Sequence, residues 1–340
     1  MLAAVNLAEL EETLSRPTPT VVETLRGIDG DVVILGAGGK MGPSLARMAK
    51  RAIDLSGSPN AVHAVSRYTD QTMRAPLEDL GVHTIACDLL ERSAVRDLPE
   101  AAAVIFMAGT KFGTSTDRST TWALNSLLPG IVAERYAGVP TVVFSSGNVY
   151  PFVADGQAAT EEVEPSPVGE YAWSVLARER IFEHFAATAG SPLLIYRLNY
   201  ASELRYGVPL DIARKVLSQR PINLAMGSFN TIWQGDANAI ALSCVDLAST
   251  PTKILNVTGP ETVSVRSLAL RFGELLDRQP IFEGAPEPTA LLSDSSQACE
   301  HFGQPSVNIE TLTEWIAAWL LDGGPTLDKP THYEVRDGTF

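Results

Sequence analysis

The sequence predicts an α/β protein built on a doubly wound parallel sheet, in which helices cover both faces of the strands. Three observations predict it: short apolar runs alternate with helical patterns, a glycine-rich loop directly follows the first run, and 340 residues suffice for a large core. Runs that are apolar throughout are typical of strands buried on both faces. The predicted strands cover residues 31–36, 61–66, 82–88, 102–108, 141–146, 193–198 and 253–259.

Elements outside these strands follow from local patterns. Residues 6–16 predict a short amino-terminal helix with Asn6 as its N-cap, ended by prolines 17 and 19. A helix over 40–53 follows the first strand, and further helices are expected near 119–137 and 170–188. The predicted domains are an extension over 1–29, a sheet domain over 30–198 and about 230–259, and a smaller interleaved domain over about 199–229 and 260–340.

Composition and charge exclude several classes of protein. Forty acidic against 26 basic side chains give a net charge of −14, which repels phosphate backbones and anionic lipids, so neither nucleic acid nor a membrane is an expected partner. No apolar run approaches the ~18 residues of a bilayer span, and the first ten residues lack the pattern of a secretory signal, so a cytoplasmic location is expected. Three cysteines and five histidines without metal-ligand spacing predict buried thiols and no metal site.

The glycine loop after the first strand indicates a ligand. Gly36, Gly39 and Gly42 are spaced G-x-x-G-x-x-G between a predicted strand and a predicted helix, the context in which such a loop binds the pyrophosphate of a dinucleotide. Glycine permits the tight turn and the close approach of backbone N–H groups to phosphate. The predicted binding residues of the loop are Gly36, Gly38, Gly39, Lys40, Met41 and Gly42. The alternative is a tight strand-to-helix turn that binds nothing.

The end of the second strand predicts which dinucleotide is bound. NAD enzymes usually present Asp or Glu there to the ribose 2′-hydroxyl, whereas this chain has Ser66 and Arg67. Ser66 can donate a hydrogen bond to a 2′-phosphate and Arg67 can pair with it, so NADP is favoured over NAD. In the alternative, Arg67 is a solvated loop charge.

Further motifs, in order along the chain, resemble the extended short-chain dehydrogenase/reductase superfamily, in the NAD(P)-dependent epimerase/dehydratase branch typified by UDP-galactose 4-epimerase. After the glycine loop they are CDL at 87–89, FMAGTK at 106–111, Asn125, VFSSGNVY at 143–150, GEYAWS at 169–174, IYRLN at 195–199 and LNVTGPE at 255–261. The resemblance extends over residues 31–321 and implies a Rossmann-type domain with a smaller substrate domain. It adds cofactor contacts at Asp88, Leu89, Ala108, Gly109, Lys111, Asn125 and Tyr171.

The resemblance also implies a catalytic pair. The family's serine and tyrosine match Ser146 and Tyr171, which are 25 residues apart. A phenol beside a carbinol can take or give the hydroxyl proton while hydride moves to or from the cofactor, and the serine hydroxyl holds the oxygen in line. Taken singly, Ser146 could simply end a strand and Tyr171 could pack at a helix start.

Val175 departs from the family pattern, which places a lysine four residues after the tyrosine. That lysine binds the cofactor ribose and lowers the pKa of the tyrosine. Three explanations stay open: another cation activates Tyr171, the reaction differs, or the domain only binds cofactor. Lys111, after the fourth strand, is the first candidate for the missing catalytic cation, and Arg178, seven residues beyond Tyr171 on the same helix face, is the second.

The substrate side departs from the pattern as well. Nucleotide-sugar members carry an arginine that clamps the diphosphate, and Phe229 stands at the matching position, so a free sugar, sugar acid or polyol is favoured over a nucleotide sugar. Residues that follow the strands at the carboxyl edge of the sheet are the predicted substrate contacts. They are Ser146, Asn148, Arg197, Asn199, Arg205 and Tyr206. Structural ion pairs are the alternative for Arg197 and Arg205.

Together with the resemblance, these residues predict an NADP-dependent oxidoreductase or epimerase that acts on a hydroxyl of a carbohydrate-like small molecule. Val175 motivates the alternative, a catalytically quiet NAD(P)-binding regulatory or partner protein. The helices near 119–137 and 170–188 carry apolar side chains and resemble those through which extended family members often dimerise, so a homodimer is expected.

Overall fold

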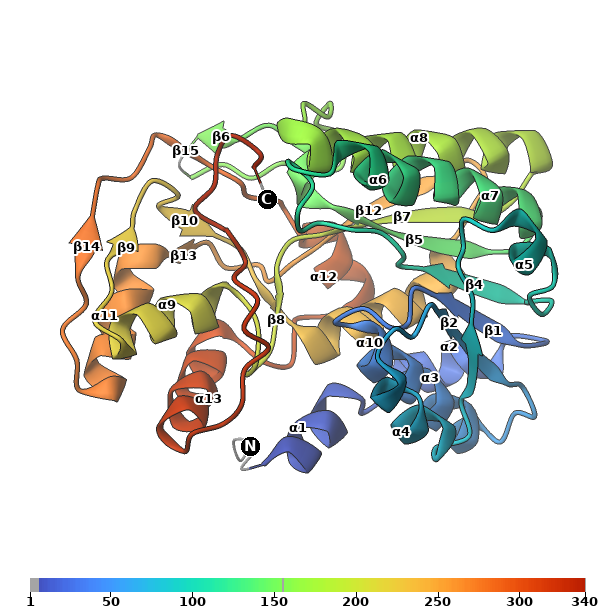
Figure 1. Ribbon diagram of the computed structural model, residues 1–340, viewed down its shortest axis with the longest axis horizontal. Helices are drawn as coiled ribbons and strands as arrows, with labels where there is room; N and C mark the ends of the chain where they lie inside the picture. Colours follow the sequence, from blue (N-terminus) through green and yellow to red (C-terminus); the bar gives the residue numbers. More distant parts are fainter. Residues whose placement is uncertain (1–5, 155, 340) are drawn as a thin grey trace.

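The computed structural model describes residues 6–154 and 156–339 and confirms the predicted fold class. Seven parallel strands form one sheet in the order β12-β7-β5-β4-β1-β2-β3, with helices on both faces (Figure 1). The strands are β1 (Val32–Leu35), β2 (Val62–Ser66), β3 (His83–Ala86), β4 (Ala103–Phe106), β5 (Thr141–Ser146), β7 (Leu193–Leu198) and β12 (Lys253–Val257). Each lies within one of the predicted runs.

The central strand β1 shows why the sheet needs helices on both faces. Val32 and Ile34 belong to a core formed with α3 (Gly42–Ser56) and α10 (Gln234–Ser243). Val33 and Leu35 point the other way, into a core formed with α7 (Leu128–Arg135) and α8 (Gly169–Ala189). Because successive side chains of a strand alternate between the faces, a strand without polar residues must be covered on both.

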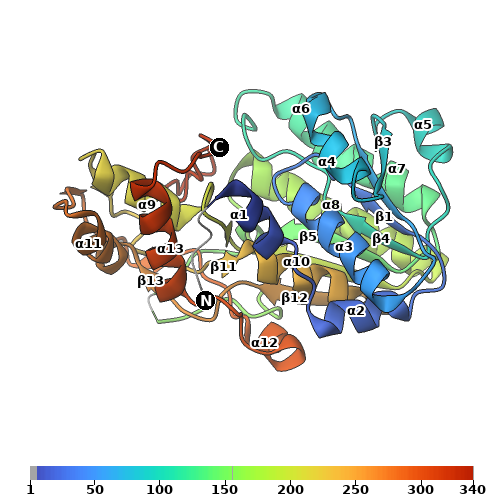
Figure 2. The same cartoon turned by 90° about the horizontal axis from the view of Figure 1, so that it is seen from below.

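The amino-terminal extension forms two helices where one was predicted. α1 (Leu7–Leu14) begins at the predicted N-cap, where Asn6 Oδ1 accepts a hydrogen bond from the N–H of Glu9 at 3.0 Å. Pro19 opens a second helix, α2 (Pro19–Arg26), because the missing N–H of proline costs nothing in a first turn. α2 lies beside α3 (Figure 2).

The predicted helix near 119–137 is interrupted in its middle. α6 (Arg118–Trp122) and α7 are joined by a π-helical turn, η2 (Ala123–Leu127), and such turns occur frequently at functional sites. Within this turn, Asn125 Nδ2 donates to the carbonyl of Thr110 and to Ser174 Oγ, both at 2.9 Å. The turn therefore ties the loop after β4 to α8, which is the second predicted helix.

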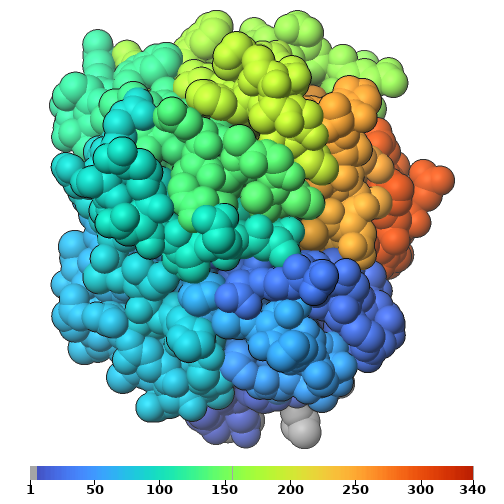
Figure 3. Space-filling view, turned by 90° about the vertical axis from the view of Figure 1, so that its right-hand side faces the viewer, coloured from blue at the N-terminus to red at the C-terminus, as the bar shows by residue number. Residues whose placement is uncertain are grey.

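The part of the chain remote from the sheet has a core of its own. It is formed by α9 (Val208–Leu217), α11 (Val265–Leu276) and α13 (Ile309–Leu321), together with leucines of α1. After α13 the chain runs back along the boundary between this core and the sheet (Figure 1). Figure 3 shows the opposite end of the molecule, where blue, green and orange segments far apart in sequence lie side by side. The predicted domain boundaries stay a prediction.

The remaining elements are short. They are η1 (Gln71–Met73), α4 (Ala75–Glu78), α5 (Arg92–Arg96), η3 (Gly147–Val149), β6 (Val153–Ala154), β8 (Ala201–Ser202), β9 (Ile222–Asn223), β10 (Ser228–Phe229), β11 (Ile232–Trp233), η4 (Cys244–Leu247), β13 (Val263–Ser264), β14 (Phe282–Glu283), β15 (Thr289–Ala290) and α12 (Ser296–Phe302).

A buried ion pair joins β7 to α8. Arg197 Nη2 lies 2.6 Å from Glu179 Oε2, and the two side chains are 2% and 0% exposed. Arg197 Nη1 also donates to the hydroxyl of Tyr150 at 2.8 Å. All three groups are away from water, so each depends on its partners for solvation.

Arg197→Met is expected to lower the free energy of unfolding by about 3–5 kcal/mol, because it leaves the Glu179 carboxylate buried without its partner. Urea denaturation followed by circular dichroism measures the change. Arg180→Met is the matched control: Arg180 pairs with Glu183 on the exposed side of the same helix, and its loss should cost at most about 1 kcal/mol. Equal costs for the two variants would contradict this account of the buried pair.

Candidate active site

Close backbone contacts require the glycines of the loop between β1 and α3. Gly36 has a φ of +93°, and a Cβ there would lie 2.5 Å from the amide nitrogen of Ala108, beyond the end of β4. A Cβ on Gly38 would lie 2.4 Å from Ser66 Oγ, and one on Gly42 would lie 2.3 Å from a carbonyl oxygen of the loop itself. Only glycine fits these contacts, so the loop lies directly on the ends of β2 and β4.

Two adjoining cavities form a groove along the carboxyl edge of the sheet, and Gly36, Gly39, Met107 and Gly109 line both. The first cavity, of about 230 Å³, includes the predicted cofactor contacts Gly38, Ser66, Arg67, Asp88, Leu89 and Ala108. The second cavity, of about 290 Å³, includes the predicted residues Lys40, Met41, Lys111, Ser146, Asn148, Tyr171, Asn199 and Tyr206. A glycine-rich loop at the junction of a long groove fits a dinucleotide, whose pyrophosphate would lie against Gly36, Gly38 and Gly39.

Two predicted cofactor contacts, Gly42 and Asn125, line neither cavity. Gly42 lies in the first turn of α3, beneath the loop. Asn125 is fully buried, and its Oδ1 accepts hydrogen bonds from the N–H of Thr110 at 2.8 Å and from Arg178 Nη2 at 2.9 Å. Asn125 is therefore a positioning residue for the loop after β4, because its amide is used entirely within the protein.

Ser146 and Tyr171 meet in the second cavity. Ser146 is the last residue of β5, Tyr171 lies in the first turn of α8, and a hydrogen bond joins their side chains. Ser146 Oγ also donates to Asn148 Oδ1 at 3.0 Å. Burial raises the pKa of Tyr171, whereas the positive charge of Arg178 and the hydrogen bond with Ser146 lower it. Two linked hydroxyls beside the groove can exchange a proton with a substrate hydroxyl.

Val175 cannot take the role of the missing lysine, because its side chain has no charge and no hydrogen-bond donor. Its side chain is 1% exposed and packs with Val149, Tyr150 and Ala159.

Arg178 is a buried cation whose charge lowers the pKa of Tyr171. Its Nη1 donates to the carbonyl of Phe144 at 2.8 Å, and its Nη2 donates to Asn125 Oδ1. Burial lowers the pKa of the Arg178 guanidinium, and the charges of Tyr171 and Glu179 oppose that effect. Arg178, the second of the two cations predicted from the sequence, is therefore the one whose charge lowers the pKa of Tyr171.

Lys111, the first candidate, also reaches the second cavity. Its Nζ lies 5.9 Å from the ring centroid of Tyr171 and 5.5 Å from that of Tyr200. Burial lowers the pKa of Lys111 to about 8, and the negative charge of Asp211 opposes that effect.

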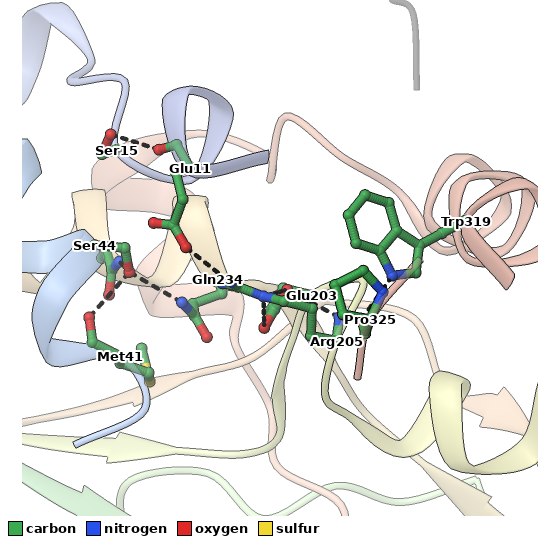
Figure 4. Close-up of polar contacts among 10 residues, drawn as sticks. Glu11, Ser15, Met41, Ser44, Glu203, Arg205, Gln234, Trp319 and Pro325 are labelled. Atoms are coloured by element: carbon green, nitrogen blue, oxygen red, sulfur yellow. Dashed lines mark hydrogen bonds and ion pairs between the residues drawn. The ribbon is translucent and has the colours of Figure 1, made fainter. Parts of the chain in front are cut away.

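Arg197 and Arg205 are not brought to either cavity, so their predicted role as substrate contacts is not supported. Arg197 is held by Glu179 in the interior. Arg205 Nε lies 3.1 Å from Glu203 Oε1, and its Nη1 lies 2.7 Å from Glu11 Oε1 (Figure 4). Both guanidinium groups are thus paired with carboxylates within the fold.

The remaining predictions concern Phe229, a metal site and a membrane-spanning helix. Phe229 is fully buried, with its ring centroid 6.2 Å from that of Tyr333, so it is a core residue. Among residues 6–154 and 156–339, no group of three side chains is placed to hold a metal ion. In the same part of the chain, no helix is both long and apolar enough to cross a membrane.

Solved structures of epimerases resemble this chain over most of its length. UDP-glucose 4-epimerase from Thermotoga maritima, with UDP-glucose, gives a TM-score of 0.70 at 14% identity, covering 86% of this chain and 99% of that one. UDP-glucuronic acid 4-epimerase from Bacillus cereus, in complex with NAD, gives 0.70 at 15% identity, covering 86% and 99%. MoeE5, in complex with UDP-glucuronic acid and NAD, gives 0.69 at 23% identity, covering 86% and 100%. At these identities the likeness shows the fold.

The sequence itself places the chain in a family, although no curated protein matches it. The model of the NAD-dependent epimerase/dehydratase family matches residues 32–219, which is more than half of the chain. This stretch contains the glycine loop, Ser146 and Tyr171. The chain therefore belongs to the NAD-dependent epimerase/dehydratase family and is an enzyme of the extended short-chain dehydrogenase/reductase type, with a nicotinamide dinucleotide as its cofactor.

Proposed function

We propose that the protein is an NADP-preferring oxidoreductase or epimerase that acts on a hydroxyl of a small carbohydrate-like molecule. The observation that carries this proposal is the hydrogen-bonded pair of Ser146 and Tyr171 in the second cavity, at one end of a groove that fits a dinucleotide. The names of structural neighbours, which include UDP-glucose and UDP-glucuronic acid, support a carbohydrate-like substrate.

The roles of the residues follow from their places in the groove. A nicotinamide dinucleotide, when bound, supplies the hydride acceptor or donor. Tyr171 Oη takes the proton of the substrate hydroxyl during oxidation and returns it during reduction, while Ser146 Oγ holds the substrate oxygen in line. Arg178 favours the ionised form of Tyr171, which burial disfavours. Asn125 fixes both Arg178 and the loop after β4.

A free sugar, sugar acid or polyol suits the cavities better than a nucleotide sugar does. A diphosphate requires positive charge, and Phe229 supplies none. A further cavity of about 300 Å³ beside α9 is lined by three basic residues, Arg214, Lys215 and Arg220. Two of them are paired with the carboxyl-terminal segment, Arg214 with Asp328 at 2.9 Å and Lys215 with Glu334 at 3.2 Å. Because Arg214 and Lys215 are already paired with carboxylates, their positive charge is not available to a diphosphate.

One further proposal concerns assembly and rests on the sequence and on exposed side chains. We infer a homodimer through α6, α7 and α8, because Trp122, Leu127 and Trp173 are exposed on these helices and the turn between them. The cytoplasmic location stays a prediction.

Tyr171→Phe is expected to lower turnover by about 100-fold or more, because it removes the group that exchanges the substrate proton, while cofactor affinity is kept. The measurement is a screen of sugars, sugar acids and polyols with NADP⁺, followed by nicotinamide absorbance and by product analysis, since an epimerase gives no net absorbance change. Tyr136→Phe is the control, because the Tyr136 hydroxyl bonds only to the Pro99 carbonyl, away from the groove. Turnover that survives in Tyr171→Phe would remove Tyr171 from the mechanism.

The same screen separates the proposed enzyme from the catalytically quiet binder that Val175 suggests. An unmodified protein that binds NADP⁺ and turns over no compound of the screen would favour the binder.

Arg67→Ala is expected to remove most of a preference for NADP(H) over NAD(H), because a lost charge-assisted contact to the 2′-phosphate is worth about 1.5–3 kcal/mol. Ser66 and Arg67 line the first cavity, which supports this assignment. Fluorescence titration with both cofactors measures it, with Arg92→Ala as a control, since Arg92 pairs with Glu134 on the exposed surface. Equal affinities in the unmodified protein would refute the preference.

Arg178→Met is expected to move the rise in oxidation rate with pH to higher pH, by about one unit or more. The ionised Tyr171 is the base, so loss of a nearby positive charge raises its pKa and delays the rise. Arg178→Lys keeps the charge and should restore much of the profile, and thermal melts check that each variant folds. Lys111→Ala should lower the rate more than Val175→Ala without moving the profile. A shift in Lys111→Ala and none in Arg178→Met would assign the activating charge to Lys111.

A further inference from the structure

The carboxyl-terminal segment, residues 325–339, crosses from the core around α9 to helix α8 (Figure 1). It contains no helix or strand, so its course is set by contacts of single residues. The N–H of Leu327 donates to the carbonyl of Arg205 at 3.0 Å, and the next residue, Tyr206, lines the second cavity. The segment thus starts one residue away from the wall of that cavity.

The middle of the segment is fixed to the core around α9. Asp211 of α9 accepts hydrogen bonds from the N–H and the hydroxyl of Thr331, both at 2.7 Å, and the Tyr333 side chain is buried in the same core. The carbonyl oxygen of Thr331 lies 3.5 Å from Lys111 Nζ. This part of the segment therefore joins α9 to the loop after β4, which lines the second cavity.

Arg336 fixes the segment near its end. Its Nη1 donates to the carbonyl of Thr289 at 2.7 Å, and its Nη2 donates to Thr289 Oγ1 at 2.6 Å. The guanidinium also lies over the ring of Phe152, 4.4 Å from the ring centroid. Gly338 is only two residues further along the chain, so these contacts constrain its position.

Gly338 packs backbone to backbone against the start of α8. Gly338 has a φ of +76° and Gly169, the first residue of α8, has a φ of +83°. A Cβ on Gly338 would lie 2.4 Å from the carbonyl oxygen of Val168, and a Cβ on Gly169 would lie 2.5 Å from the carbonyl oxygen of Gly338. Neither residue can gain a side chain unless the segment and the helix move apart.

The first turn of α8 depends on such contacts, because its N-cap residue, Val168, has no side-chain group that can accept from the free N–H groups. At the far end of the turn, Ser174 Oγ donates to the carbonyl of Tyr171 at 2.8 Å, and Asn125 Nδ2 donates to Ser174 Oγ. Tyr171 therefore lies between a contact with Asn125 and a contact with Gly338.

The place of this turn decides the geometry of the proposed catalytic pair. Ser146 belongs to β5 and Tyr171 to α8, so their hydrogen bond lasts only while the start of the helix keeps its place at the end of the strand. Hydrogen bonds tolerate only small changes in length, and a displacement of about 1 Å at a catalytic group can lower a rate about 100-fold.

We infer that the carboxyl-terminal segment is a positioning element of the active site, in which Gly338 sets the place of the first turn of α8 and so the place of the Tyr171 hydroxyl against Ser146. Gly338 is itself kept in place by Arg336 and by the contact of Thr331 with Asp211. The inference rests on the proposed function, in which Tyr171 exchanges the substrate proton. It adds residues that act through Tyr171.

The test is Gly338→Ala in the full chain, with Gly323→Ala as the matched control. Gly323 has a φ of +71°, and a Cβ there would have no atom within 4 Å. Both substitutions place alanine in the left-handed region at a similar backbone cost, so a difference between them reports the contact with α8.

Hydrogen exchange followed by mass spectrometry tests the contact without a substrate. In Gly338→Ala, peptides covering residues 169–176 are expected to exchange about 10-fold faster than in Gly323→Ala or the unmodified protein, because the start of α8 opens more often. Peptides of α11 and α13 should exchange at the same rate in all three proteins, which checks that the rest of the fold is kept.

Activity gives a readout that a loss of stability would not move. In a reaction found by the substrate screen, Gly338→Ala is expected to lower kcat about 10-fold or more while the affinity for NADP⁺ is unchanged. The rise in oxidation rate should also move to higher pH. A displaced Tyr171 loses the hydrogen bond with Ser146 and part of the effect of Arg178, and both of these lower its pKa.

Other ionisable groups near Tyr171 include Lys111, Tyr200 and Tyr206. They are the same in both glycine variants, so they do not account for a difference between the two pH profiles.

Arg336→Met should reproduce both effects in weaker form, because it releases the end of the segment. Arg336→Lys keeps the positive charge over Phe152 and should restore part of the loss.

Equal exchange of residues 169–176 in the two glycine variants would overturn the inference, whether or not a substrate is known. A loss of turnover in Gly338→Ala with an unmoved pH profile would overturn it as well. If the unmodified protein turns over no compound while Gly338→Ala still speeds exchange at the start of α8, the proposed function is refuted and the role of Gly338 in placing the helix stands.

Discussion

The contact between the loop after β1 and the chain after β4 is the constraint on which the site depends. The N–H of Gly36 donates to the carbonyl of Val65 at 2.9 Å, and the N–H of Met107 donates to that of Leu35 at 2.8 Å. These bonds continue the sheet ladder into the two loops and leave no space for a side chain at Gly36. The floor of the groove at Gly36 is therefore backbone, and the lysines that reach the groove come from further along each loop, at Lys40 and Lys111.

The missing lysine of the family pattern changes how charge is supplied to Tyr171. The family pattern places a lysine one turn after the tyrosine, whereas Val175 at this position packs in an apolar cluster and supplies no charge. Arg178 lies below, held by Phe144 and Asn125 rather than by ligand. A guanidinium that is fixed by protein groups acts on the tyrosine whether or not cofactor is bound. The π-helical turn at Asn125 is part of this arrangement, because it places the amide between Arg178 and the loop after β4.

The sequence predicted the sheet well because its signal is local. Each strand is an apolar run, and the glycine spacing follows from contacts within a single strand–loop–helix unit. The place of Arg197 was not predictable in this way, because its partner Glu179 is 18 residues away in the sequence. Arg205 pairs with the nearby Glu203 but also with Glu11, which is 194 residues away. The sequence around an arginine does not show whether the fold brings such a distant carboxylate to it.

The direction of the Lys40 side chain could not be predicted from the sequence for the same reason. Its neighbour Tyr206 belongs to a loop after β7, and the order of the strands in the sheet places that loop beside Lys40. The carboxyl-terminal segment contacts residues at and beside this cavity. Its Thr331 contacts Lys111, and a Cβ on Gly169, two residues before Tyr171, would lie 2.5 Å from the carbonyl oxygen of Gly338. The family match ends at residue 219, so this segment lies outside it. The match thus covers the residues proposed to hold the cofactor and to move the proton, whereas the position of Lys111 also depends on contacts with a segment that the match does not describe.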